Sequence, residues 1–238
     1  GGSGAVVIAP GDGVNSDHVA IELARDSAGV GGMVAFMAGK TYVLDRTVRF
    51  LLGQTVVGNG AKLIRAPQAV STTATPITSD VTNTISVAAG DGIKFKVGQW
   101  LNVYSGGVGG SLAVKISNIS GDTITCSSAF RLEAGGTWAA GATVAASGNL
   151  VELMDGCSLV DLILDGNTTN APYASWQTHA EVQMRGQDVT VYRCTIQNAS
   201  GEGIVETGVS PFTDSRNKIA YNVITGIKGN GVHLSASW

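Results

Sequence analysis

The feature that most constrains this chain is a short sequence pattern that recurs three times in its C-terminal part. Each copy is an apolar, β-rich run closed by Gly or Asn, and the copies occupy residues 162–167, 194–198 and 222–226. With Leu164, Ile196 and Ile224 taken as equivalent, successive copies lie 32 and 28 residues apart. A second signal begins at Gly201 and returns at Gly229 with the same 28-residue step. Shared periods of this length indicate stacked units that bury their apolar faces against their neighbours. We predict a right-handed parallel β-helix.

The composition suits stacked strands. Of the 238 residues, 33 are glycine and only 14% are charged. Parallel strands in a stack bury both faces of each run and turn on Gly or Asn, so this composition fits a solenoid better than a helical bundle or a disordered chain. The net charge of −3 argues against a nucleic-acid-binding surface, so no nucleic-acid partner is expected. A neutral or acidic glycan is compatible with it.

Neither a cofactor nor a membrane partner is expected. Cys126, Cys157 and Cys194 have unrelated spacings, with no CxxC motif and no paired His, which predicts buried thiols rather than a metal site. No apolar run reaches the roughly 18 residues that a membrane span needs, and no basic segment precedes an apolar one as in a signal peptide.

We divide the chain into four predicted segments. They are a linker remnant and first strand (1–8), a capping helix with the first coils (9–66), an insertion (67–147), and further coils (148–238) that are expected to continue in a longer native chain. The helix should run from about His18 to Ala28, with Ser16 or Asp17 as its N-cap, and plug the open end of the stack. In the insertion the period disappears and short strands alternate, which predicts a small antiparallel β-barrel or sandwich, with either a hairpin or a longer loop at Gly121.

Three N-terminal motifs carry a resemblance to a known family. They are Gly11-Asp12-Gly13 with Asp17, the run Gly-Met-Val-Ala-Phe-Met-Ala-Gly-Lys-Thr-Tyr at 32–42, and Val-Val-Gly-Asn-Gly at 56–60. Together they resemble the first segment of pectate-lyase-like β-helix proteins, a superfamily that includes bacteriophage tailspikes. The resemblance covers roughly residues 9–66 and 149–238. It departs from the family pattern at Met37, where Pro is usual, which affects a turn and not the fold.

This resemblance implies a fold more specifically than a reaction. It implies a phage tail protein that binds a bacterial surface polysaccharide, capsule or O-antigen, and that could depolymerise it by glycosidic bond cleavage. It also implies a homotrimer and a location in the virion. One alternative is a secreted bacterial polysaccharide lyase or hydrolase acting as a monomer. A second alternative is a structural shaft without catalytic activity.

The candidate catalytic residues are carboxylates. Hydrolysis of a glycan needs two of them, about 5 to 5.5 Å apart for retention or 6.5 to 9.5 Å for inversion. Glu202 and Glu206 flank an apolar pair, and their spacing puts both on one side of a strand, some ~13 Å apart. Either could therefore pair only with a residue of an adjacent coil, and Asp214 is a third candidate. The paired aspartates and Gly-His-Gly triplet of polygalacturonases and the Asp-Pro-His motif of alginate epimerases are absent, so no family catalytic residue is carried over.

The candidate substrate-binding residues lie in and near a break in the period at residues 168–179. Tyr173, Trp176 and His179 lie in that break, and Arg193 follows it. Aromatic rings there could stack on the apolar faces of sugars. The alternative is that Tyr173 and Trp176 cover the flank of a coil. Asp165 is expected to bond its own turn backbone, and Asn198 and Asn222 are expected to bond stacked turns.

Overall fold

The structure is a computed structural model that describes residues 4–105, 110–173, 179–207 and 215–234. The chain divides into two units. The β-helix unit comprises Gly1–Ala66, Asn149–Pro172 and Ala180–Trp238, and the inserted unit comprises Pro67–Gly148 and Tyr173–His179. Each unit has its own hydrophobic core.

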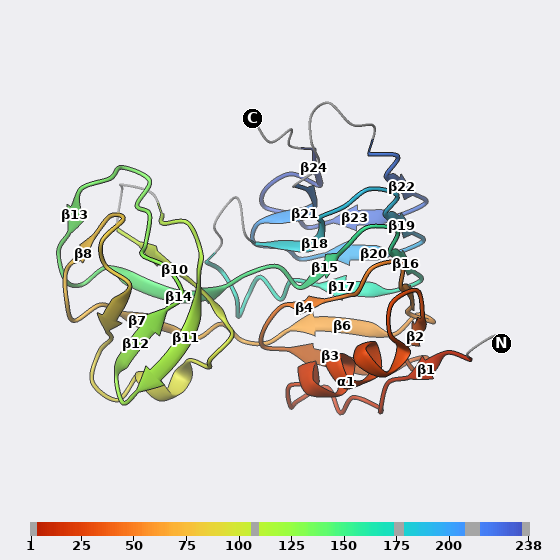
Figure 1. The fold of residues 1–238 in the computed structure, drawn as a ribbon, viewed down its shortest axis with the longest axis horizontal. Helices are drawn as coiled ribbons and strands as arrows, with labels where there is room; N and C mark the ends of the chain where they lie inside the picture. Colours follow the sequence, from red (N-terminus) through yellow and green to blue (C-terminus); the bar gives the residue numbers. More distant parts are fainter. Residues whose placement is uncertain (1–3, 106–109, 174–178, 208–214, 235–238) are drawn as a thin grey trace. The chain divides into compact units, whose positions relative to one another are not determined.

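The β-helix unit consists of three parallel sheets, through which the chain passes in turn in successive coils (Figure 1). Sheet A holds β1 (Val6–Val7), β2 (Met33–Ala35), β5 (Thr55–Val57), β16 (Ser158–Val160), β19 (Thr190–Tyr192) and β22 (Lys218–Ala220). Sheet B holds β3 (Thr41–Leu44), β6 (Lys62–Arg65), β17 (Ile163–Asp165), β20 (Thr195–Gln197) and β23 (Val223–Thr225). Sheet C holds β4 (Val48–Arg49), β15 (Val151–Leu153), β18 (Ala180–Met184), β21 (Glu202–Glu206) and β24 (Val232–Leu234). The predicted all-β parallel β-helix is confirmed.

The strand register reproduces the period read from the sequence. Leu164 pairs with Ile196 and Ile196 with Ile224, as the steps of 32 and 28 residues require. The N–H of Gly229 bonds the carbonyl of Gly201 at 2.9 Å, so the second repeated signal also stacks. The paired leucines and isoleucines lie in one continuous core, because every second residue of a strand points inward.

Helix α1 spans His18–Ala28, as predicted, and packs Ile21 and Ala24 into the core of the β-helix unit. Asp17 is the N-cap residue, but no side-chain cap bond forms. Its carboxylate instead accepts the N–H of Val43 at 2.7 Å, and Ser16 donates to Asp45. Asp17 is thus the N-cap residue, as predicted, but its side chain binds a donor of sheet B instead of the helix.

The inserted unit is antiparallel throughout its strand pairs, as predicted. Its larger sheet holds β7 (Val70–Thr72), β14 (Thr143–Ser147), β10 (Trp100–Tyr104), β11 (Val114–Ser120), β12 (Thr123–Cys126) and β9 (Thr84–Ser86). Its smaller sheet holds β13 (Thr137–Trp138) and β8 (Ile77–Thr78), and a short 3-10 helix spans Gly92–Lys94. The hairpin between β11 and β12 turns at Gly121, whose φ of +57° suits a residue without a Cβ.

All three cysteines are free and buried, which confirms the prediction of buried thiols. Among the described residues, no helix is long and apolar enough to cross a membrane.

Candidate functional site

The outward face of sheet B is a polar surface. Strand alternation sends Leu63, Leu164 and Ile196 into the core, so the residues beside them point outward. The outward positions of three neighbouring strands are Lys62 and Ile64 of β6, Ile163 and Asp165 of β17, and Thr195 and Gln197 of β20. Four of these six side chains are polar, and the row offers both donors and acceptors.

The corner between sheets A and B carries a row of chemically different side chains. Asp161, Arg193 and Tyr221 follow β16, β19 and β22 and stack one coil apart. All three have left-handed backbones, with φ of 55°, 52° and 58°. This conformation is uncommon for residues with a Cβ and an outlier for a bulky one. Glycine would adopt it without strain, so each of these side chains is kept at a cost in stability.

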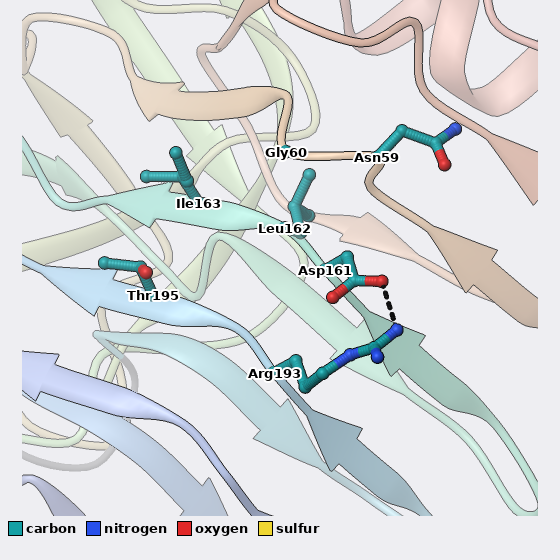
Figure 2. Close-up of a pocket in the computed structure, with 7 residues that line it drawn as sticks. All are labelled: Asn59, Gly60, Asp161, Leu162, Ile163, Arg193 and Thr195. Carbon is teal, nitrogen blue, oxygen red and sulfur yellow. Dashed lines mark hydrogen bonds and ion pairs between the residues drawn. The ribbon is translucent and has the colours of Figure 1, made fainter.

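A pocket of about 340 Å³ lies where this corner meets sheet B (Figure 2). Its lining residues are Asn59, Gly60, Asp161, Leu162, Ile163, Arg193 and Thr195. Arg193 donates to Asp161 at 2.6 Å, and its guanidinium carbon lies 5.0 Å from the centre of the Tyr192 ring. Tyr192 contacts Tyr221 edge to face at 5.3 Å, and Tyr221 is 81% exposed. A cation can hydrogen-bond the rim of a sugar, and an aromatic ring beside it can pack against the apolar face.

A second pocket of about 400 Å³ lies at the other end of the sheet B face. It is lined by Ile64, Asp165, Asn167, Thr168, Thr169, Asn198 and Gly226. Both pockets fall in the range of roughly 300 to 1,000 Å³ typical of small-molecule sites. Ile163 of the first pocket and Asp165 of the second are alternate residues of β17, about 7 Å apart along the strand. That separation lets one chain of linked sugars occupy both pockets.

Asp165 is the centre of the second pocket. One carboxylate oxygen accepts from Lys62 at 2.7 Å and from Gln197 at 2.9 Å. The other accepts from the N–H of Asn167 at 3.0 Å and from Asn198 at 3.2 Å. Burial alone would raise the pKa of Asp165, but these four donors hold that pKa below its ordinary value. Asp165 is therefore ionised at neutral pH, and it fixes the side chains of Lys62 and Gln197 on the sheet face.

The predicted substrate-binding residues that the structure describes belong to different units of the chain. Arg193 is exposed and lines the first pocket. Tyr173 belongs to the inserted unit and packs against Tyr104 with ring centres 5.5 Å apart. His179, of the same unit, is 1% exposed, and its Nδ1 lies 3.1 Å from the hydroxyl of Ser147. Trp176 lies outside the described residues.

The predicted catalytic glutamates bind turns of the β-helix. Ile204, between them on β21, lies in the core, so alternation turns Glu202 and Glu206 toward the same inward side. Glu202 accepts the N–H of Asn230 at 2.6 Å, and Glu206 accepts from Asn217 at 2.7 Å. Their register partners one coil before are Ala180 and Met184, so neither faces a carboxylate there. Asp214 lies outside the described residues.

Several residues of the sheet B face were missed, although the sequence held a signal for some of them. Asp161 and Tyr221 lie 32 residues before and 28 residues after the predicted Arg193, the same steps as between the core positions, so extending the period to its polar residues would have found them. Asp165 was expected only to bond its own turn; that bond to Asn167 forms, together with the bonds to Lys62 and Gln197. Asn222 bonds the backbone of Val191 and Cys194, as expected for a stacked turn.

Two carboxylates, Asp161 and Asp165, lie at the sheet B face. Asp161 lies in the turn before β17 and has a left-handed backbone (φ 55°), and Asp165 is the last residue of that strand. Each carboxylate is also occupied by an internal cation.

Comparisons with known proteins return phage tailspikes. No family model matches the sequence, and no curated protein matches it significantly. Three solved structures are similar in part. The Gp54 tailspike of Acinetobacter baumannii bacteriophage AP22, solved with capsular saccharide, is 10% identical over 94% of this chain, with a TM-score of 0.30. The gp49 tailspike of Pseudomonas phage LKA1 is 14% identical over 80% of this chain (TM-score 0.27), and the gp61 tailspike of Pseudomonas phage phi297 is 13% identical over 93% (TM-score 0.29). This chain spans 42%, 37% and 42% of their lengths. The fold assignment rests on the strand pairing of the chain itself.

Proposed function

We propose that this protein binds a bacterial surface polysaccharide on the outward face of sheet B, as part of a phage tail appendage. The observation that supports the proposal is the pair of pockets at the two ends of that face, one beside Arg193 and the other around Asp165. Strands that stack in register hold the side chains between the pockets in fixed rows, and such pre-organisation lowers the entropic cost of binding an extended ligand.

The proposal assigns the two pockets different parts of one glycan. The pocket beside Arg193 supplies a charged group for the rim of one sugar, and the neighbouring rings of Tyr192 and Tyr221 offer an apolar face. The pocket around Asp165 supplies amide and hydroxyl groups of Asn167, Thr168 and Asn198 for the hydroxyls of another. Lys62 and Gln197 lie between them, already oriented by Asp165.

Binding is tested with a panel of capsular and O-antigen polysaccharides and two matched variants. Arg193→Gly removes a pocket side chain and relieves a strained backbone, so the protein should fold. Arg216→Gly is the control, because Arg216 also has a left-handed backbone (φ 49°) and also pairs with an aspartate one coil earlier, Asp188, but lies outside both pockets. We expect a glycan that the native protein retains to be lost by Arg193→Gly and kept by Arg216→Gly. Equal binding by both variants would refute the assignment of the sheet B face.

Cleavage of the bound glycan is the finer part of the proposal. The same panel, followed for new reducing ends and for the absorbance of unsaturated uronates, separates hydrolysis, which gives only the first signal, from elimination, which gives both. Substitution of Glu202, Glu206 and Asp214 tests the predicted catalytic residues. A homotrimer and a location in the virion belong to the same proposal, and sedimentation of the purified chain tests the first.

A further inference from the structure

A second polar cluster lies on the outward face of sheet C. Val48, Val151 and Val182 enter the core from β4, β15 and β18, so the next residue of each strand points outward. These outward residues are Arg49, Glu152 and Gln183, which are register partners across three coils. Arg185, directly after β18, lies on the same side as Gln183.

Two guanidinium groups in this cluster share one buried carboxylate. Arg49 Nε donates to Glu152 Oε2 at 2.7 Å, and Arg185 Nε lies 3.3 Å from Glu152 Oε1. The carboxylate of Glu152 is 2% exposed, while Arg49 and Arg185 are 51% and 34% exposed. Since each Nε is one hydrogen bond from the same carboxylate, the two Nε atoms lie within roughly 8 Å of each other.

One guanidinium is enough to neutralise one carboxylate, so the cluster has a surplus positive charge. The charge is accessible at the outer ends of both arginines, on a protein whose net charge is −3. A neutral amide also positions Arg185. Its Nε donates to Gln183 Oε1 at 2.9 Å, and the amide nitrogen of Gln183 donates to the hydroxyl of Thr207 at 2.6 Å. A planar fork of donors fixed in this way matches an oxyanion that can bridge both arginines.

We propose that Arg49 and Arg185 form a binding site for the carboxylate of an acidic sugar. The inference rests on the proposed binding of a polysaccharide and deepens it, because it names an acidic glycan as the ligand class. It uses residues of sheet C only, so it stands apart from the pockets of sheet B. Glu152 acts as an internal competitor that keeps both guanidinium groups aligned while the site is empty.

The test uses the free sugar acid and the chain as it is. D-glucuronate, D-glucose and inorganic phosphate are titrated separately while the side-chain Nε–H resonances of Arg49 and Arg185 are followed by NMR. We expect glucuronate, and not glucose, to shift both resonances, with an effect that weakens as salt is raised. Shifts with phosphate but not with glucuronate would overturn the carboxylate assignment, and no shift with any of the three would overturn the site.

Two variants separate a binding role from a structural one. Arg185→Gln leaves Glu152 paired with Arg49 and should lower glucuronate affinity about tenfold, the effect of losing one charge-assisted contact. Arg216→Gln removes the same charge elsewhere and should leave the affinity unchanged. Glu152→Gln removes the competitor and should raise the affinity several-fold. An unchanged glucuronate affinity with Arg185→Gln would mean that the arginines serve only to neutralise the glutamate.

These outcomes are distinguishable from failure of the proposed function. Loss of polysaccharide retention by Arg193→Gly concerns sheet B, whereas the glucuronate titration needs no polymer and reports on sheet C alone.

Discussion

The salt bridge between Arg65 and Glu181 is the place where one substitution should cost the β-helix unit most. Arg65 Nη2 lies 3.1 Å from Glu181 Oε1 and 3.3 Å from Oε2, and the side chains are 10% and 0% exposed. Removing one partner of a buried pair leaves the other charge buried without a counter-charge, which lowers the free energy of unfolding by about 3 to 5 kcal/mol. Arg65→Met keeps most of the side-chain volume and removes the charge, so its free energy of unfolding should fall by that amount at pH 8.

The pH dependence of this loss follows from the pKa of Glu181. Burial raises that pKa above its ordinary value, Arg65 opposes the rise, and the charge of Asp165 adds to it. Without Arg65 the folded-state pKa must rise further, so the folded protein binds the Glu181 proton more tightly than the unfolded chain does. A raised folded-state pKa gives stability that is present below the unfolded pKa and lost as pH rises through the folded value. The deficit of Arg65→Met should therefore be small near pH 4 and largest above neutrality.

Urea unfolding followed by circular dichroism at several pH values measures this deficit. Arg216→Met is the control, since the Arg216–Asp188 pair is exposed and its loss should leave the urea midpoint unchanged. Adding Glu181→Gln to Arg65→Met should recover part of the stability, because no buried charge is then left. A deficit under ~1 kcal/mol, or one that does not change with pH, would refute the reasoning.

Two further predictions concern packing. Gly166→Ala would place a Cβ 2.6 Å from both Glu181 Oε1 and the carbonyl oxygen of Asn198, so it should lower the melting temperature. In the control Gly110→Ala the Cβ meets no atom nearer than 3.5 Å, so the melting temperature should not change. Burial raises the pKa of Cys194 to about 11 and that of Cys126 to about 12, so at pH 8 at most roughly one Cys194 thiol in a thousand is ionised. Alkylation of the folded protein by iodoacetamide at pH 8 should thus be far slower than in urea; equal rates would contradict the burial of the thiols.

The coil architecture was predictable because the repeat spacing of the sequence reflects the stacking of the coils directly. Leu164, Ile196 and Ile224 stack only if the intervening residues form one turn of a solenoid, so their spacing specifies the register as well as the fold. The helix was predictable from its flanking turn residues. The side-chain partner of its N-cap residue was not, because the donor that Asp17 binds, the N–H of Val43, comes from a strand that only the folded chain brings near.

The site was less predictable, because spacing gives a side of a strand but does not say which side faces the core. Glu202 and Glu206 share a side, as their spacing implies, but Ile204 and Val205 are both apolar and both buried, so the pattern of β21 does not distinguish inside from outside. Asp165 has a clear local role as a turn residue, so its sequence context gives no indication of its bonds to Lys62 and Gln197 of neighbouring coils.

The left-handed corner residues bear on how such a surface can diversify. At Asp161, Arg193 and Tyr221 the side chain stands outside the coil, while the strands on either side are held by backbone hydrogen bonds and by core residues. An acid, a base and an aromatic residue occupy equivalent corners with nearly the same φ, so the coil accepts all three chemistries without a change of path. Substitution at the corner therefore leaves the backbone path of the coil intact and changes only the chemical group on the surface, so the surface can diversify by single substitutions.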